Sequence, residues 1–303
     1  MNILIAMIVP FLWGTTASAT HLGFMDWPPL ALAVLRSLPA GLLLLLIKPV
    51  WPKAGQWRLL LIHSAINIAL FFWLIFLVAQ NLPATFAAVG MAGTPVVALL
   101  FSFLYKGSIP NVYQVLACVL LVLATWTLFS PGNQHVQWLG IIAMVLAMVV
   151  MVAGSVFAQQ VMSQVNWWTM VVWQLILGGI MLLPFAAWQW LSNPQAYATA
   201  LDINMSRVLS GIWLVVINTA LAYALFIWVL QRVSIVQFAF ASIANPIGGV
   251  IIGAWLVHEH FSWPQYLIMA VMVATSLLAQ WLSQKPRGSA AAKTTLNPDR
   301  VVS

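Results

Sequence analysis

Four polar side chains interrupt long apolar stretches of this sequence, and all are of types that bind small solutes. They are Arg36, Asn67, Asn218 and Asn245. A guanidinium can donate two parallel hydrogen bonds to a carboxylate, and an amide both donates and accepts, so these groups suit a neutral or zwitterionic solute. The alternative is that Arg36 binds backbone carbonyls beside a proline kink and that the asparagines link helices. The sequence leaves both interpretations open.

Aromatic residues deep in the same apolar stretches supply a second kind of contact. Trp13, Phe72, Trp73 and Tyr223 are expected to wall an apolar or aromatic pocket against the hydrophobic part of the solute. The other interpretation is that these rings pack in the protein interior or face lipid. Which one holds depends on how the surrounding helices are oriented.

Two prolines fall in the middle of apolar stretches, where they are expected to bend helices. Pro95 follows Thr94, and Pro246 follows Asn245. Proline removes one backbone donor and frees a carbonyl, which a membrane tolerates only where the break is buried or borders a cavity. We therefore predict hinges at both prolines, in helices near the centre of the fold.

Acidic residues are few, and none lies inside an apolar stretch. A proton-driven exporter of lipophilic cations needs a carboxylate there, so that class is disfavoured. The sequence has no Walker A loop, no H-E-x-x-H and no G-x-S-x-G, so we predict that the protein is not an enzyme and uses no cofactor. His258, Glu259 and His260 are spaced unsuitably for a metal site, and no metal is expected. Glu259 is expected to cap the helix that follows it, near 264–283.

The elements that position these residues must be membrane helices. The chain is 63% hydrophobic and 5% charged, with a mean hydropathy of +1.02, whereas soluble domains carry about 25% charged residues. Each apolar run approaches the roughly 20 residues that cross about 30 Å of hydrocarbon as a helix. We predict an all-α integral membrane protein with ten transmembrane helices. They are expected near 3–23, 30–48, 58–80, 84–105, 111–129, 137–159, 168–191, 207–230, 235–257 and 264–283.

The net charge of +7 is explained by topology rather than by nucleic-acid binding. With the N-terminus inside, basic residues gather in the inner connections and the C-terminal tail. Asp26, Asp202 and Glu259 fall in the outer connections, where only Arg207 runs against the trend. This positive-inside pattern places both termini in the cytoplasm of a multi-pass protein of a bacterial-type inner (plasma) membrane. Residues 284–303 are expected to form a disordered cytoplasmic tail.

The chain contains an internal duplication. At a shift of 151 positions, residues 57–130 fall on 208–281, which places Asn67 on Asn218; at a shift of 138, Arg36 falls on Gln174. The difference of 13 positions (151 − 138) lies in a longer outer connection at 192–203. We predict one five-helix repeat over 1–130 and a second over 137–283. Because five is odd, the second repeat is inverted in the membrane, as in carriers that work by alternating access.

Short motifs resemble a known family. FLWGT at 11–15 and WPPLALAVLR at 27–36 resemble the first helices of the EamA-type exporters of the drug/metabolite transporter superfamily. ANPIGG at 244–249 and HEHFSWPQ at 258–265 resemble the close of their second repeat. The resemblance spans residues 5–283 and implies a ten-helix inner-membrane transporter, often an exporter of amino acids or other metabolites. The first repeat departs from the pattern, since Ser108 stands where the second has Glu259.

These observations together predict an inner-membrane transporter that exports amino acids or related small neutral or zwitterionic metabolites by alternating access. The alternative is a non-transporting membrane scaffold or a partner subunit of a larger complex, which predicts no solute flux from isolated liposomes. The expected partners are a small-molecule solute and the lipid bilayer, not nucleic acid. Self-association into a homo-oligomer stays open.

Overall fold

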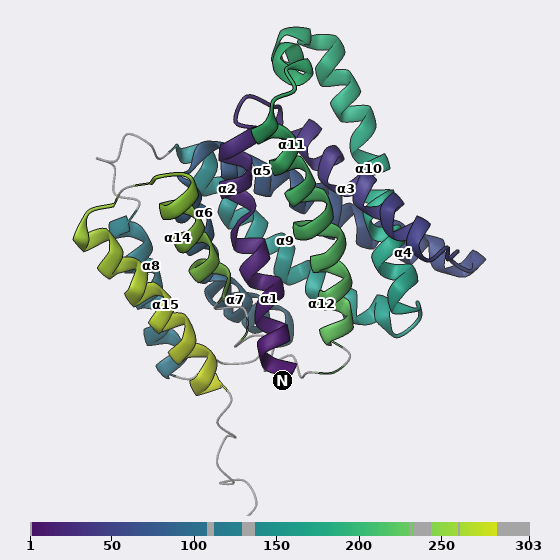
Figure 1. Ribbon diagram of the computed structural model, residues 1–303. Coiled ribbons are helices and arrows are strands. Elements are labelled where there is room, and N and C mark those ends of the chain that lie inside the picture. The colour runs from purple at the N-terminus through teal and green to yellow at the C-terminus, as the bar shows by residue number, and fades with distance from the viewer. Residues whose placement is uncertain are drawn as a thin grey trace, which may run out of the picture.

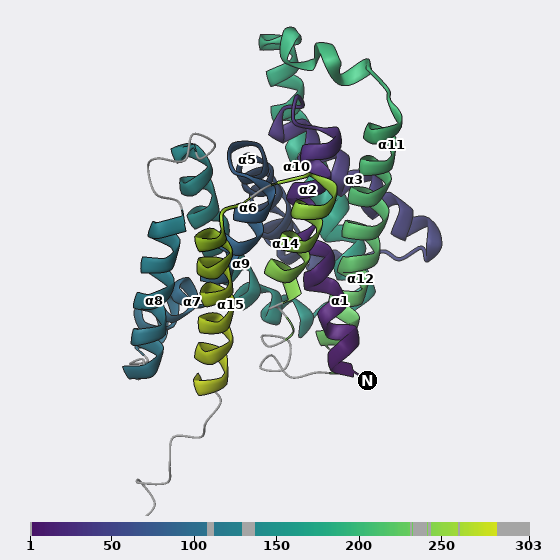
Figure 2. The ribbon, with the colours of Figure 1, turned by 60° about the vertical axis from the view of Figure 1, so that its left-hand side comes forward.

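The computed structural model describes residues 2–107, 112–128, 137–230, 232, 241, 244–259 and 261–283. Within these ranges every regular element is a helix. The helices lie side by side in a bundle, with α8 (Val112–Leu128) and α15 (Trp263–Ser283) paired at one edge (Figures 1 and 2). The upper end of α10 (Trp167–Ser192) and the segment after it stand above the other helices in both views.

In the first half of the chain, α-helices alternate with short 3-10 and π-helical segments. It consists of α1 (Asn2–Gly14), α2 (Thr16–Gly23), α3 (Pro29–Ile47), the 3-10 turn η1 (Ala54–Gln56), α4 (Trp57–Ser64), the π-helix η2 (Ala65–Leu70), α5 (Phe71–Asn81), α6 (Ala84–Gly90), the 3-10 turn η3 (Met91–Gly93), α7 (Thr94–Lys106) and α8. The second half consists of α9 (Trp138–Met162), α10, the 3-10 helix η4 (Pro194–Leu201), α11 (Met205–Ile212), the π-helix η5 (Trp213–Leu221), α12 (Ala222–Leu230), α14 (Ala244–Leu256) and α15.

Six stretches of the described chain are long and apolar enough to cross a bilayer. They are Ile5–Gly23, Pro29–Ile47, Ala54–Asn81, Trp138–Met162, Trp167–Ser192 and Met205–Val229, and shorter apolar helices occupy Val115–Ala124, Ala244–Leu256 and Trp263–Thr275. These elements agree with the expected all-helical membrane protein. The expected span at 84–105 is divided among α6, η3 and α7, and much of the one at 235–257 lies outside the described residues. Ten spans and an inverted second half stay predictions.

Helices change their winding where polar residues lie. α1 ends at Gly14 because Thr15 turns its backbone N–H to the carbonyl of Leu12, three residues back, at 3.1 Å. In η2 and η5 the helix widens to π-winding, and these two segments contain Asn67 and Asn218. π-helical turns are rare and occur mostly at functional sites. The two asparagines related by the 151 shift therefore share one kind of local backbone.

α3 and α10 cross at glycines that allow close approach. Gly41 lies against Ile176 and Gly179 lies against Leu38, so a Cβ at either glycine would come within 2.7 Å of the opposing side chain. Gly179 and Ile176 follow Gly41 and Leu38 by 138 positions, which makes the contact reciprocal. Because 41 meets 176 while 38 meets 179, the two helices run antiparallel. Small residues at such crossings are typical of helix packing in membranes.

α14 packs closely between α1 and α6 (Figure 1). Gly248 lies against the carbonyl of Phe11, and Gly249 lies against the methyl group of Ala88, with no room at either position for a Cβ. Without side chains at these positions, the backbones of α14 and its neighbours come together. This tight packing fixes the position of Asn245, one turn before Gly249, relative to the break between α1 and α2.

Arg207, the basic residue that runs against the charge trend, is paired with an acid. Its Nη2 lies 2.7 and 2.9 Å from the two carboxylate oxygens of Asp26, and its Nε donates to the carbonyl of Gly23 at 3.0 Å. Ser206 donates its hydroxyl to the carbonyl of Leu22 at 2.7 Å. These bonds join the start of α11 to the end of α2.

Glu259 caps a different helix from the one that the sequence predicts. Its carboxylate accepts the backbone N–H groups of Ala84 and Thr85, at 2.5 and 2.9 Å, in the first turn of α6. The prediction that it caps 264–283 is therefore wrong, since the side chain of Gln265 accepts the N–H of Ser262 at the start of α15. The cause is tertiary: α14 lies beside α6, so the loop after α14 meets the N-terminus of α6.

Candidate functional site

Arg36 lies in the interior, 3% exposed, and its hydrogen bonds to described residues go to neutral groups. Its Nη2 donates to Oδ1 of Asn218 at 2.6 Å, and its Nε donates to the hydroxyl of Thr219 at 2.8 Å. The ring of Phe72 lies under the guanidinium, with 4.4 Å from Cζ to the ring centre. Arg36 on α3 is thus held by η5 and α5, and the π-winding of η5 presents two successive polar side chains to it.

Asn218 is fully buried and connects Arg36 to the break between α1 and α2. Its Oδ1 also accepts the hydroxyl of Thr16 at 3.0 Å, and its Nδ2 donates to the carbonyl of Leu12 and to the hydroxyl of Thr15 at 3.3 Å. All four hydrogen-bonding directions of the amide are used. We name Arg36, Thr15, Thr16, Asn218 and Thr219 the Arg36 cluster.

Asn67 belongs to a second polar group on the other side of the α3 and α10 crossing. Its Nδ2 donates to Nδ1 of His63 at 2.8 Å and to the carbonyl of Gly154 at 3.2 Å. Since Nδ1 accepts, the proton of a neutral imidazole is assigned to Nε2, which donates to Oε1 of Gln174 at 2.9 Å. Nε2 of Gln174 is buried without a partner among the described residues. We name His63, Asn67 and Gln174 the His63 cluster.

The predicted aromatic residues form a row beside Arg36, with one exception. Phe72 contacts Tyr223 edge to face at 5.8 Å between centres, and Tyr223 contacts Trp13 at 5.3 Å. Phe226 extends the row on the far side of Trp13 at 5.1 Å. Trp73 is 37% exposed and lies outside the row. Successive helical residues point about 100° apart, and here Phe72 faces inward while Trp73 points to another side of the helix.

The remaining predicted residues lie apart from both clusters. Asn245 is half-buried in the first turn of α14, where its carbonyl faces Gly14 at the end of α1. Pro246 is buried in the same turn, and Pro95 is the second residue of α7, directly after the 3-10 turn η3. A 3-10 turn thus precedes Pro95, and the bends and hinge roles predicted at both prolines stay predictions.

Several members of the two clusters were not singled out from the sequence. Thr15, Thr16 and Thr219 carry hydroxyls that complete the bonding of Asn218 and Arg36. Hydroxyls are common in membrane helices because they can bond to their own backbone, so their type gave no signal. Gln174 could have been found from the sequence, because it falls on Arg36 at the 138 shift.

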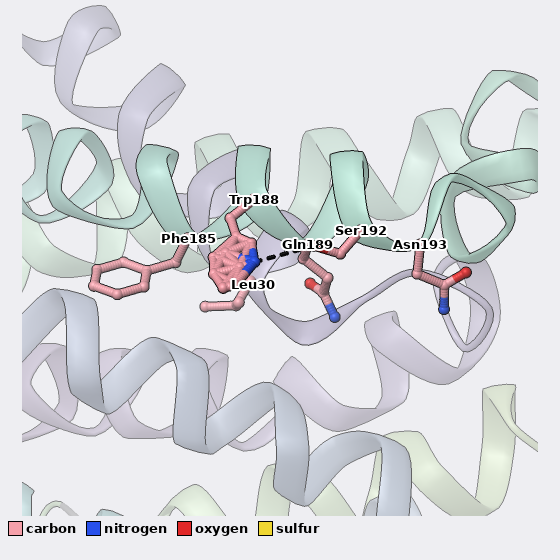
Figure 3. Close-up of a pocket in the computed structure, with 6 residues that line it drawn as sticks. All are labelled: Leu30, Phe185, Trp188, Gln189, Ser192 and Asn193. Atoms are coloured by element: carbon pink, nitrogen blue, oxygen red, sulfur yellow. Dashed lines mark hydrogen bonds between the residues drawn. The ribbon is translucent and has the colours of Figure 1, made fainter.

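A separate hollow lies where α10 rises past the start of α3, away from both clusters. It has a volume of about 370 Å³ and is lined by Leu30, Phe185, Trp188, Gln189, Ser192 and Asn193 (Figure 3). The indole of Trp188 donates to the hydroxyl of Ser192 at 3.0 Å, which holds the ring along the helix. The sequence gave no expectation for this hollow.

Apolar helices of membrane length with polar side chains buried between them define a multi-spanning membrane protein. The chain belongs to the EamA-like transporter family, whose model matches residues 1–130 and 138–280. The resemblance drawn from the sequence motifs is thereby confirmed. A family of transporters, rather than of enzymes, is the setting in which the two clusters are to be understood.

Similar proteins extend over nearly the whole chain. Protein PecM of Dickeya dadantii is 26% identical and covers 92% of this chain and 92% of its own length. An uncharacterized inner membrane transporter, YedA of Escherichia coli K12, is 25% identical over 88% of this chain and 86% of its own. A probable amino-acid metabolite efflux pump of the same strain is 24% identical over 90% of this chain and 92% of its own length. A crystal structure at 17% identity shares the fold, with a TM-score of 0.61 over 93% of this chain and 96% of that one.

Proposed function

We propose that this protein exports amino acids or related small metabolites across a bacterial-type inner membrane by alternating access. The observation that carries the proposal is the Arg36 cluster, in which a buried guanidinium is oriented between helices of the two halves of the chain. A buried arginine at membrane depth is costly and is usually functional. A relative whose name describes amino-acid metabolite efflux supports the choice of solute.

In this proposal Arg36 and the asparagines orient the polar end of the solute, while the aromatic row contacts its apolar part. Asn67, Asn218 and Asn245 are the asparagines that we assign to this role. The guanidinium suits a carboxylate because its planar fork can donate two parallel bonds. Solute entry requires the helices around the Arg36 cluster to separate, since Arg36 and Tyr223 are only 3% and 7% exposed.

The motion that we propose is an exchange of conformation between two inverted halves. The reciprocal, antiparallel crossing of α3 and α10 supports it, because counterpart residues of inverted repeats should meet in this way. Pro95 and Pro246 would serve as the hinges of α7 and α14. Both termini are proposed to be cytoplasmic, from the distribution of basic residues.

Efflux from proteoliposomes tests the proposal. Vesicles containing the full chain are loaded with a mixture of amino acids and common small metabolites, and the contents are followed by mass spectrometry with and without a pH step. We expect selective loss of a few solutes, unaltered in mass, and no such loss from protein-free vesicles. Retention of every solute under both conditions would instead favour the scaffold. A product of changed mass would indicate catalysis.

A further inference from the structure

The acidic residues in the described part of the chain all lie away from Arg36. The sequence has four, and three of them lie in the described part. Asp26 is paired with Arg207, Glu259 caps α6, and Asp202 lies exposed in the connection before α11. The fourth, Asp299, belongs to the C-terminal segment that was predicted to form the cytoplasmic tail. The charge of Arg36 therefore has no carboxylate partner among the described residues.

The surroundings of Arg36 orient its charge without neutralising it. Asn218 and Thr219 accept two of its N–H groups, and Phe72 offers the electron-rich face of its ring. Neither kind of contact brings a negative charge. A buried charge of one sign is expensive in a low-dielectric interior unless an opposite charge joins it. The site is thus electrostatically prepared for one anionic group.

A buried donor without an acceptor lies in the aromatic row. Nε1 of Trp13 is buried and has no hydrogen-bond partner among the described residues. A buried donor left unpaired loses the bond that water would supply, so a ligand acceptor would be favourable there. The row from Phe72 through Tyr223 to Trp13 links this indole to the guanidinium, and its faces are apolar. The guanidinium calls for an anionic acceptor such as a carboxylate, whereas the neutral indole calls for any hydrogen-bond acceptor.

We infer that the preferred ligand of the Arg36 cluster is a small carboxylic acid with an apolar or aromatic tail and no free amino group. The inference rests on the proposed function and narrows its solute class. A monocarboxylate brings one negative charge to one buried positive charge. A zwitterionic amino acid brings in addition an ammonium, which finds no carboxylate in the described interior. N-acylated and deaminated relatives of apolar amino acids meet the requirement, whereas the amino acids themselves bind less tightly.

Matched probes that differ only in charge test this inference. Binding of 3-phenylpropionate, L-phenylalanine and phenethylamine to the purified full chain in lipid nanodiscs is measured by calorimetry. A second series uses 4-methylpentanoate, L-leucine and isopentylamine, so that the tail is varied independently of the charge. We expect the carboxylate of at least one series to bind about tenfold or more tightly than its amino acid, and the amine not to bind.

Two variants separate the donors from the apolar wall. Arg36→Gln removes the charge and should abolish the preference for the carboxylate over the amino acid. Trp13→Phe keeps an aromatic ring and leaves Arg36 in place, so the carboxylate should still be preferred over the amino acid. Trp126→Phe is the matched control, because Trp126 is 64% exposed on α8, and it should change nothing. Thermal unfolding of each variant confirms that it is folded.

The possible outcomes distinguish this inference from the proposed function. L-phenylalanine or L-leucine binding as tightly as its carboxylate would overturn the inference and leave amino-acid export standing. So would a carboxylate preference that survives in folded Arg36→Gln. If neither carboxylate binds up to about 10 mM, the weak end of measurable affinity, the inference also fails. Retention of every solute in the efflux experiment, by contrast, would remove the proposed function itself.

Discussion

The Arg36 cluster and the His63 cluster contain residues that the two sequence shifts relate to one another. Arg36 corresponds to Gln174 at the 138 shift, and Asn67 corresponds to Asn218 at the 151 shift. The guanidinium reaches Asn218 directly at 2.6 Å, whereas Gln174 reaches Asn67 only through the ring of His63. Positions related by the sequence shifts therefore hold a fixed charge in one case and a neutral chain of hydrogen bonds in the other.

The helices that the two asparagines contact also differ, in their continuity and in the polar groups that they offer. Asn218 bonds to the broken region between α1 and α2, where Thr16 adds a hydroxyl. Asn67 bonds to α9, which is continuous there, and the counterpart of Thr16 at the 138 shift is Gly154, which contributes only its carbonyl. The difference teaches that duplicated positions can keep their geometry while their chemistry diverges. We propose that the charged cluster contributes most to solute binding, and that the neutral one mainly links helices, with Asn67 as its contact to the solute.

The largest expected effect comes from the two asparagines. Asn218→Leu leaves Arg36 and Thr16 without their shared acceptor in a fully buried site, and should cost about 3 kcal/mol of stability and abolish transport. Asn67→Leu, at a half-buried position among neutral groups, should cost about 1 kcal/mol. Thermal unfolding and efflux measured on both variants check the difference. Equal losses would remove the distinction between the clusters, and a folded double variant with unchanged efflux would sink the proposed function.

Arg36→Gln converts the charged cluster toward the composition of the neutral one. Efflux of the accepted solute should fall about tenfold or more, because a charge-assisted bond to the carboxylate is lost. Stability should fall less than in Asn218→Leu, since the variant removes a buried charge rather than stranding one. The matched change on the other side is Gln174→Leu, which should alter efflux much less. Unchanged efflux in a folded Arg36→Gln protein would show that the guanidinium is only structural.

His63→Leu makes the neutral cluster resemble its counterpart, because residue 214 at the 151 shift is a leucine. The variant breaks the link from Asn67 to Gln174 and should cost about 1 to 2 kcal/mol, the loss of two buried hydrogen bonds partly offset by apolar burial. Unfolding temperature and efflux are measured together. Lower stability with nearly normal selectivity is expected; altered solute selectivity would place the His63 cluster in the binding site as well.

The crossing of α3 and α10 allows a comparison of packing alone. Gly41→Ala and Gly179→Ala each introduce a Cβ within 2.7 Å of the opposite helix, so both should destabilise the protein, by about 1 to 3 kcal/mol and by similar amounts. Gly55→Ala is the control, because a Cβ there would meet no atom within 4 Å. Unfolding in a mild detergent measures all three. A large loss in only one of the two crossing variants would argue against a reciprocal contact.

The contacts of Glu259 and the orientation of Trp73 could not be predicted from local sequence. An acid just before an apolar run predicts a cap for that run, yet Glu259 reaches the helix at Ala84, which is 175 residues away in sequence. Trp73 adjoins Phe72, which is fully buried, but points to another side of the same helix. Hydropathy indicates which segments cross the membrane, but it does not indicate which face of each helix points to the protein interior.

The sequence by itself determined the membrane character of the chain, the family resemblance and the duplicated polar positions. Each of these follows from local composition, spacing or internal similarity. Only the tertiary structure decided that Arg36 meets Asn218 across 182 residues, that Gln174 meets His63 across 111, and that the row from Phe72 to Trp13 adjoins the guanidinium. The physical reason is that helix–helix contacts in membranes depend on close packing of small residues and on a few hydrogen bonds, which hydropathy does not encode.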